Sequence, residues 1–214
     1  MSLCAIIPIK PLRQGKSRLS SVLTDEKREE LNEFLLVSTL DCIRAIPEIN
    51  NIFVISHDPY ALSIARDHGA HTVFENRHTN INKALRKATA AAKAFNSTRS
   101  LIIPSDLPLL TPDDIISILE LTGDAPEMII VPDRKSSGTN AMYIDPIGAI
   151  KYNFGDWSFK KHIEQAERKR ITIKKFVCDN LSFDLDLPED LDQLAEKVNL
   201  ISGMSNLLEM EAGT

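Results

Sequence analysis

The fold is indicated first by residues 51–74, which run NIFVISHDPYALSIARDHGAHTVF. Residues 51–56 form an apolar run that is typical of a buried strand. Residues 59–68 place apolar side chains at helical spacing, and Gly69 can end that helix. Residues 71–74 predict another short strand. A strand, a helix and a second strand in this order indicate a parallel pair joined by a crossover helix.

The same alternation continues on both sides of this segment. Thr24 is well placed to cap a helix over residues 25–46, and Thr111 to cap another that begins at Pro112. Further strands are predicted at 3–9, 101–104, 127–131, 140–144 and 171–177, and further helices at 80–95, 158–168 and 188–198. This order predicts an α/β fold with three layers, in which helices cover both faces of a mixed, mostly parallel sheet. We expect one domain over residues 1–201 and a polar C-terminal tail over 202–214.

Composition excludes several classes of protein. Hydrophobic residues make up 43% of the 214 residues and charged residues 26%, which is typical of a globular domain. No apolar run approaches the roughly 18 residues that cross a bilayer. A net charge of −5 offers no basic face for nucleic acid. Three distant cysteines and a start without a basic leader favour a reducing compartment, so we expect a cytoplasmic protein without a nucleic-acid or membrane partner.

A basic loop follows the first predicted strand. Lys10, Arg13, Lys16 and Arg18 lie within nine residues, with Gly15 among them. Cations in such a loop can neutralise a triphosphate, and a glycine lets the backbone approach it closely. The segment is not a P-loop, because Lys10 occupies the position where that motif has its first glycine. A solvated basic loop is the alternative.

Two segments carry carboxylates where ligands bind in such folds, beyond the carboxyl ends of strands. Asp106 follows the apolar strand at 101–104 and lies between two prolines. Asp184 and Asp186 are two residues apart, so on an extended segment their side chains share a face about 7 Å apart. Together the three would suit one or two Mg²⁺ ions. The alternatives are a turn-forming role for Asp106 and a helix cap at Pro188 for one of the pair.

Two polar stretches that contain glycine, 133–140 and 154–159, have the small hydroxyls and backbone amides that suit an anionic acceptor. Ser158 opens a predicted helix, and His162 follows it by about one turn. Each stretch could equally be an ordinary loop, and His162 could equally be a packing residue. The remaining histidines have no ligand spacing, and the cysteines are interpreted as small hydrophobic residues.

Taken in order, these motifs resemble the 2-phospho-L-lactate guanylyltransferase family of deazaflavin coenzyme F-420 biosynthesis, within the nucleotidyltransferase superfamily. The resemblance extends from Ile6 to about Leu191. It rests on residues 7–10 with 16–19, 81–85, 104–108, 133–134, 138–141, 154–155 with 158–159 and 162, and 183–186. The loop after Lys10 lacks the Gly-x-Gly of sugar nucleotidyltransferases, which favours a smaller acceptor.

The resemblance implies a GT-A-like, Rossmann-like fold, transfer of GMP from GTP to 2-phospho-L-lactate, and a homodimer. It implies that Asp106, Asp184 and Asp186 bind Mg²⁺. It further implies that Lys10, Thr139, Gly155 and Ser158 hold the phosphorylated acid, and that Lys16 and Arg18 grip the triphosphate. Lys16, Arg18 and Asp106 are the expected catalytic residues; Lys10, Arg13, Gly15 and Asn82 complete the expected GTP contacts.

Other functions remain open from sequence alone. Phosphoenolpyruvate or 3-phosphoglycerate could replace 2-phospho-L-lactate as the acceptor. A nucleotidyltransferase acting on a sugar phosphate or a pterin cofactor, or a metal-dependent glycosyltransferase, could share the architecture. A nucleotide-binding module without catalysis is the least favoured, because all three carboxylates are present.

Overall fold

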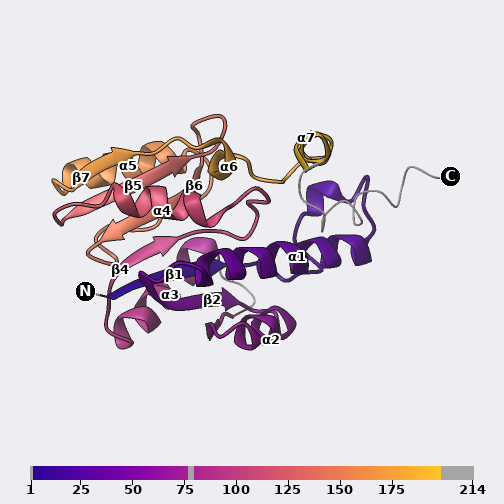
Figure 1. Cartoon of the computed structure of the whole chain (residues 1–214), viewed down its shortest axis with the longest axis horizontal. Helices are drawn as coiled ribbons and strands as arrows, with labels where there is room; N and C mark the ends of the chain where they lie inside the picture. The colour runs from indigo at the N-terminus through magenta and orange to yellow at the C-terminus, as the bar shows by residue number, and fades with distance from the viewer. Residues whose placement is uncertain (1, 77–79, 199–214) are drawn as a thin grey trace.

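The computed structural model describes residues 2–76 and 80–198, and its centre is a seven-stranded sheet in the order β3-β2-β1-β4-β6-β5-β7 (Figure 1). The strands are β1 (Ser2–Pro8), β2 (Ile49–Ser56), β3 (His71–Phe74), β4 (Ser97–Ile102), β5 (Glu127–Pro132), β6 (Thr139–Asp145) and β7 (Thr172–Lys175). β6 pairs antiparallel with both β4 and β5, and the remaining pairs are parallel. The prediction of a mixed, mostly parallel sheet is confirmed.

Helices connect the strands as the alternation predicts. They are α1 (Asp25–Arg44), α2 (Pro59–Asp67), α3 (Ile81–Ala94), α4 (Pro112–Glu120), α5 (Ser158–Arg168), α6 (Asp179–Ser182) and α7 (Pro188–Val198). The predicted caps are present: the Thr24 side chain accepts from the backbone amide of Lys27, and Thr111 forms a capping box with Asp114.

Two apolar cores separate the three layers. One face of the sheet packs against α1, α2 and α4 through residues such as Leu40, Leu62 and Ile115. The other face packs against α3 and α5, where the small side chains of Ala84 and Ala88 let α3 lie close to the strands. A third cluster joins the start of α1 to α7 and to the segment that carries Asp184 and Asp186. The α/β/α prediction is therefore confirmed.

A few local predictions needed correction. β4 begins at Ser97, four residues before the predicted strand at 101–104, because the polar residues 97–100 still pair with β1. The short helix α6 was not predicted. Asp184 and Asp186 lie in an irregular segment between α6 and α7. The predicted tail at 202–214 lies outside the described residues. In the described part of the chain, no helix is long and apolar enough to cross a membrane.

Candidate active site

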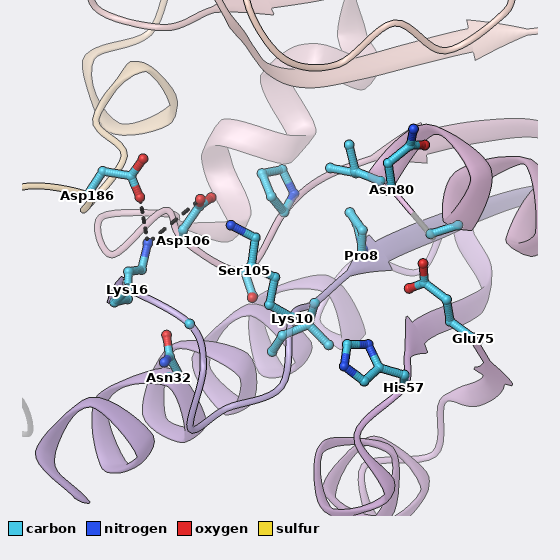
Figure 2. Close-up of a pocket in the computed structure, with 15 residues that line it drawn as sticks. Pro8, Lys10, Lys16, Asn32, His57, Glu75, Asn80, Ser105, Asp106 and Asp186 are labelled. Carbon is cyan, nitrogen blue, oxygen red and sulfur yellow. Dashed lines mark hydrogen bonds and ion pairs between the residues drawn. The ribbon is translucent and has the colours of Figure 1, made fainter. Parts of the chain in front are cut away.

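The parallel strands bring their carboxyl ends to one edge of the sheet, and a cavity of about 480 Å³ lies at that edge. Its wall combines residues that follow β1, β2, β3 and β4. At one end of the cavity lie Lys16, Asp106 and Asp186, and at the other lie His57 and Glu75 (Figure 2). One end of the cavity thus combines an ammonium with two carboxylates, and the other, next to the ends of β2 and β3, carries a single carboxylate.

The basic loop is held against α1 by its backbone. Arg28 donates to the carbonyl of Gly15 at 3.1 Å, and Asn32 donates to the carbonyl of Leu12 at 2.6 Å. A Cβ atom on Gly15 would lie 2.6 Å from the Asn32 amide nitrogen, so glycine is required for this close approach. The next residue, Lys16, has φ 53, which turns its side chain toward the carboxylates.

The cations of this loop have separate positions. The Lys16 side chain is only 6% exposed, and its ammonium lies 3.4 Å from Asp186 and 3.7 Å from Asp106. Arg18 is exposed and lies 3.8 Å from the other oxygen of Asp186, while Lys10 lines the cavity. Arg13 instead pairs with Glu26 and Glu29 on α1. Its contact with GTP stays a prediction, because in this structure it is not part of the cavity wall.

The three predicted carboxylates converge from two segments. The backbone amide of Leu185 donates to the carbonyl of Asp106 at 3.0 Å, which joins the loop after β4 to the segment before α7. Oδ1 of Asp106 is buried and has no hydrogen-bond partner among residues 2–76 and 80–198. Burial raises the pKa of Asp184, and the charges of Asp106 and Asp186 raise it further. Carboxylates this close repel one another, so the group favours a cation.

The segment with Asp184 and Asp186 is held in place by an ion pair between Arg134 and Asp190, which the sequence did not indicate. Asp190 is buried and accepts from the backbone amides of Asp186 (2.8 Å) and Leu187 (2.7 Å). Arg134 forms a short ion pair with Asp190 and donates to the carbonyl of Asp184 at 3.3 Å. Burial alone would raise the pKa of Asp190, but Arg134 and these amides hold it below its usual value. Asp190 therefore positions the segment that carries Asp184 and Asp186.

The predicted acceptor residues form a second group beside the cavity. Thr139 and His162 are buried, and Oγ1 of Thr139 lies 3.1 Å from Nδ1 of His162. Ser158 is 1% exposed, and its amide donates to the carbonyl of Gly155 at 3.0 Å. Gly155 has φ 114, a conformation that favours glycine.

His162 is neutral and has one tautomer in this arrangement. The backbone amide of Asn153 donates to its Nε2 at 2.9 Å, so the ring proton is on Nδ1 and faces Thr139. Burial lowers the pKa of His162 to about 4, with a smaller contribution from Lys161. Thr139 therefore accepts from His162, and its own hydroxyl hydrogen remains available to a ligand.

Asn82 connects α3, which lines the cavity, to the segment that carries Gly155 of the acceptor group. Its amide donates to the carbonyl of Phe154 at 3.1 Å and accepts from the amide of Phe154 at 2.7 Å. The predicted contact of Asn82 with GTP stays a prediction, because in this structure its amide hydrogen-bonds Phe154. Asn80 lines the cavity and caps α3.

His57 and Glu75 are the wall residues that the sequence did not single out. Both directly follow strands, which is the rule that found Asp106, but neither forms a motif with its neighbours. Trp157, which directly precedes Ser158, is 66% exposed and does not belong to the core.

Comparison with known proteins agrees with this geometry. Residues 3–199 match the family described as Guanylyl transferase CofC like. A phosphoenolpyruvate guanylyltransferase of Rubrobacter xylanophilus is 36% identical over 194 residues, which cover 91% of this chain and 94% of that protein. A 2-phospho-L-lactate guanylyltransferase of Methanobrevibacter smithii is 31% identical, covering 88% of this chain and 82% of that protein.

The fold also has solved counterparts. A putative nucleotide-diphospho-sugar transferase from Desulfovibrio desulfuricans G20 superposes with a TM-score of 0.74 at 16% identity, over 98% of this chain and 95% of that chain. The likeness supports a nucleotidyltransferase-like fold. Because the family match spans nearly the whole chain, and a relative above 30% identity covers most of it, this chain belongs to the CofC-like guanylyl transferase family.

Proposed function

We propose that this chain transfers GMP from GTP to the phosphate of 2-phospho-L-lactate, with lactyl-2-diphospho-5′-guanosine and pyrophosphate as products. The observation that carries this proposal is the ion-pair cluster of Lys16, Asp106 and Asp186 in the cavity wall. Asn82, which follows the wall residue Ile81, binds the backbone of Phe154, next to Gly155 of the predicted acceptor group. A donor nucleotide in the cavity and an acceptor beside it would meet at the carboxylates. The family supports the same reaction class.

The chemistry is an in-line displacement at the α-phosphorus. An oxygen of the acceptor phosphate forms a bond to that phosphorus, while the bond to the bridging oxygen breaks and pyrophosphate leaves with the electron pair. The acceptor needs no strong general base, because a phosphate monoester loses its second proton near pH ~6. The chain therefore acts chiefly by positioning and by neutralising charge.

Lys16 and Arg18 would draw charge toward the leaving pyrophosphate, with Lys10 reaching the acceptor phosphate. Gly15 lets the loop backbone approach the nucleotide. On the acceptor side, the hydroxyl hydrogen of Thr139 can be donated to an anionic oxygen, because His162 donates to Thr139 and not the reverse. The dipole of α5 favours an anion near its N-terminus at Ser158, while the amides of Ser158 and Phe159 already donate to the carbonyls of Gly155 and Ser137.

Asp106, Asp184 and Asp186 are the residues that would hold Mg²⁺. The donor set fits this ion, since all three are oxygen ligands and Oδ1 of Asp106 is buried with no hydrogen-bond partner in the described part of the chain. Among the described residues no three acidic, histidine or cysteine side chains are grouped to hold a metal ion in this arrangement, in which the Lys16 ammonium lies 3.7 Å from Asp106 and 3.4 Å from Asp186. Bound Mg²⁺ would supply Lewis-acid stabilisation of phosphate charge.

Phosphoenolpyruvate is the second candidate acceptor. The relative at 36% identity carries that name, whereas the one at 31% is named for 2-phospho-L-lactate. Both acids present a phosphate and a carboxylate on adjacent atoms, so the same hydroxyls and amides suit either.

The test supplies purified protein with GTP, Mg²⁺ and each acceptor, and follows pyrophosphate and the guanylylated product. We expect release only when an acceptor is present, and the higher kcat/KM identifies the acceptor. Asp106→Asn should lower turnover at least about 100-fold, whereas Asp113→Asn, an exposed carboxylate at the start of α4, should match the wild type. GTP binding without product from either acid would reject both acceptors; turnover in Asp106→Asn equal to that of the control would reject the metal site.

Three further properties complete the proposal. We propose a homodimer, a cytoplasmic location and a domain boundary near residue 201. The free thiols of Cys4, Cys42 and Cys178 are consistent with a reducing compartment. Light scattering would measure the oligomeric state, and a chain ending at residue 201 should keep the thermal midpoint and activity of the full chain.

A further inference from the structure

The end of the cavity away from Lys16 contains a buried carboxylate that the proposed mechanism does not use. Glu75 follows β3 directly and is 9% exposed. Its backbone amide donates to the carbonyl of Ser56 at 2.8 Å, which fixes the residue beside the end of β2. Figure 2 shows its side chain pointing into the cavity, between His57 and Asn80.

In the parts of the chain that the structure describes, the carboxylate of Glu75 has no hydrogen bond or ion pair. The nearby basic side chains are His57 and Lys87, and the ammonium of Lys87 already donates to the carbonyl of Phe74 at 2.6 Å. Burying a carboxylate without a hydrogen-bond donor is costly, and most buried polar groups in folded proteins have partners. A free, buried carboxylate that faces a cavity is therefore suited to accept hydrogen bonds from a ligand.

The orientation of a nucleotide in this cavity follows from charge. Its triphosphate belongs at the end with Lys10, Lys16 and the carboxylates, so its base belongs at the end with Glu75. In the cavity wall, Pro8, Ile81 and Ala84 supply apolar surface for the faces of a ring, while Glu75 meets its edge.

We infer that Glu75 recognises the guanine of GTP, with its two oxygens accepting from N1–H and from the N2 amine. The inference rests on the proposed function and adds the residue that selects the base. Guanine places two donors side by side on this edge, which matches the two acceptors of a carboxylate. Adenine has an unprotonated ring nitrogen there, so its lone pair would face a carboxylate oxygen.

The chemistry allows a change of specificity as the test. Glu75→Gln keeps the shape but replaces one acceptor with an N–H donor, which opposes the N2 amine of guanine. Xanthine has an oxygen in place of that amine, so it is complementary to glutamine. Inosine lacks the group altogether and reports its contribution in the wild type.

We would measure kcat/KM for GTP, ITP, XTP and ATP with the preferred acceptor. The wild type should prefer GTP over each of the others by about 10- to 100-fold, in line with discrimination by a bidentate pair. In Glu75→Gln the value for GTP should fall by a similar factor and that for XTP should rise, so that the preference inverts. The control is Glu48→Gln, in a separate cavity lined by Leu3 and Arg99, which should leave all four values unchanged.

The outcomes separate this inference from the proposed function. If the wild type turns over GTP but Glu75→Gln keeps the wild-type ratio of GTP to XTP, Glu75 does not read the base. An equal loss for every nucleotide would instead assign Glu75 to the ribose and would also overturn the inference. If the wild type gives no turnover, the proposed function fails, and the same four nucleotides are then compared by equilibrium binding to both proteins. Binding without preference for GTP in the wild type would reject the role of Glu75.

Discussion

The ammonium of Lys16 lies 3.4 Å from Oδ1 of Asp186, across 170 positions of sequence. It lies 3.7 Å from Asp106 as well, with its side chain nearly buried. Without a ligand, Lys16 therefore supplies positive charge to carboxylates that would otherwise repel one another. A metal ion bound by the same carboxylates would compete with Lys16, which would then be free to face the triphosphate.

Replacing Lys16 by methionine separates these two roles. We expect Lys16→Met to lower kcat about 10²- to 10³-fold, the usual effect of removing one donor that stabilises transition-state charge. Without nucleotide, Mg²⁺ should raise the thermal midpoint of the variant more than that of the wild type, because no ammonium competes for the carboxylates. Lys27→Met, which removes a pair with Glu30 on α1, should change neither value. Equal Mg²⁺ shifts in Lys16→Met and wild type would contradict the competition.

The pair of Arg134 and Asp190 should affect both stability and catalysis. Arg134→Met leaves the buried carboxylate of Asp190 without its guanidinium partner and removes a donor from the carbonyl of Asp184. We expect a loss of about 2 kcal/mol in the free energy of unfolding, and a fall in kcat because Asp184 and Asp186 are no longer held in place. Denaturant titration and steady-state kinetics measure the two effects. Arg168→Met, whose side chain is exposed and pairs with Glu164 on α5, is the matched control. A stability loss with unchanged kcat would limit Arg134 to a structural role.

Most of the sheet and its covering helices could be predicted because their signals are local. The apolar run at 51–56 and the cap at Thr24 act through neighbours in sequence, and the structure has both. The predicted start of β4 was wrong. Residues 97–100 are polar, so the local pattern does not indicate a strand, but they pair with β1 through a tertiary contact. Helix α6 has only four residues, too few to show a helical period.

The candidate site divides in the same way. Lys16, Asp106 and Asp186 stand in charged or proline-rich motifs after strands, and the structure brings them together. Arg13 belongs to the same basic loop as Lys16, so the sequence did not distinguish the two. Its ion pairs with acids on α1 become visible only when the position of that helix in the fold is known. The role of Asp190 depends on Arg134, 56 residues away, and Glu75 is a lone acid whose burial no local pattern reveals.

Stability should depend on pH through His162. Its pKa in the folded protein is about 4, below the ordinary value of 6.5, because burial disfavours the charged ring. Between these two values the unfolded chain binds more protons, so stability falls as the pH drops from about 6.5 toward 4 and is fully present above that window. The contribution is roughly 3 kcal/mol. Thermal midpoints of His162→Gln and wild type at pH 7.5 and 5 provide the check: the variant should lose less on acidification. A loss as large as that of the wild type would assign the pH dependence to other groups.

Two glycines with positive φ allow a backbone effect to be separated from an effect on the acceptor. Gly155 has φ 114 and lies between Phe154 and the start of α5, whereas Gly69 has φ 78 and ends the turn after α2. A Cβ atom at either position would have no neighbour within 4 Å, so the cost of alanine at both is conformational, on the order of 1 kcal/mol. We expect Gly155→Ala and Gly69→Ala to lower stability by similar amounts. Only Gly155→Ala should raise the KM of the phosphorylated acid, because Gly155 belongs to the predicted acceptor group. The KM of GTP should change little in either variant. If Gly155→Ala leaves the acceptor KM at the Gly69→Ala value, Gly155 does not hold the acid, and its conformation serves only the turn into α5.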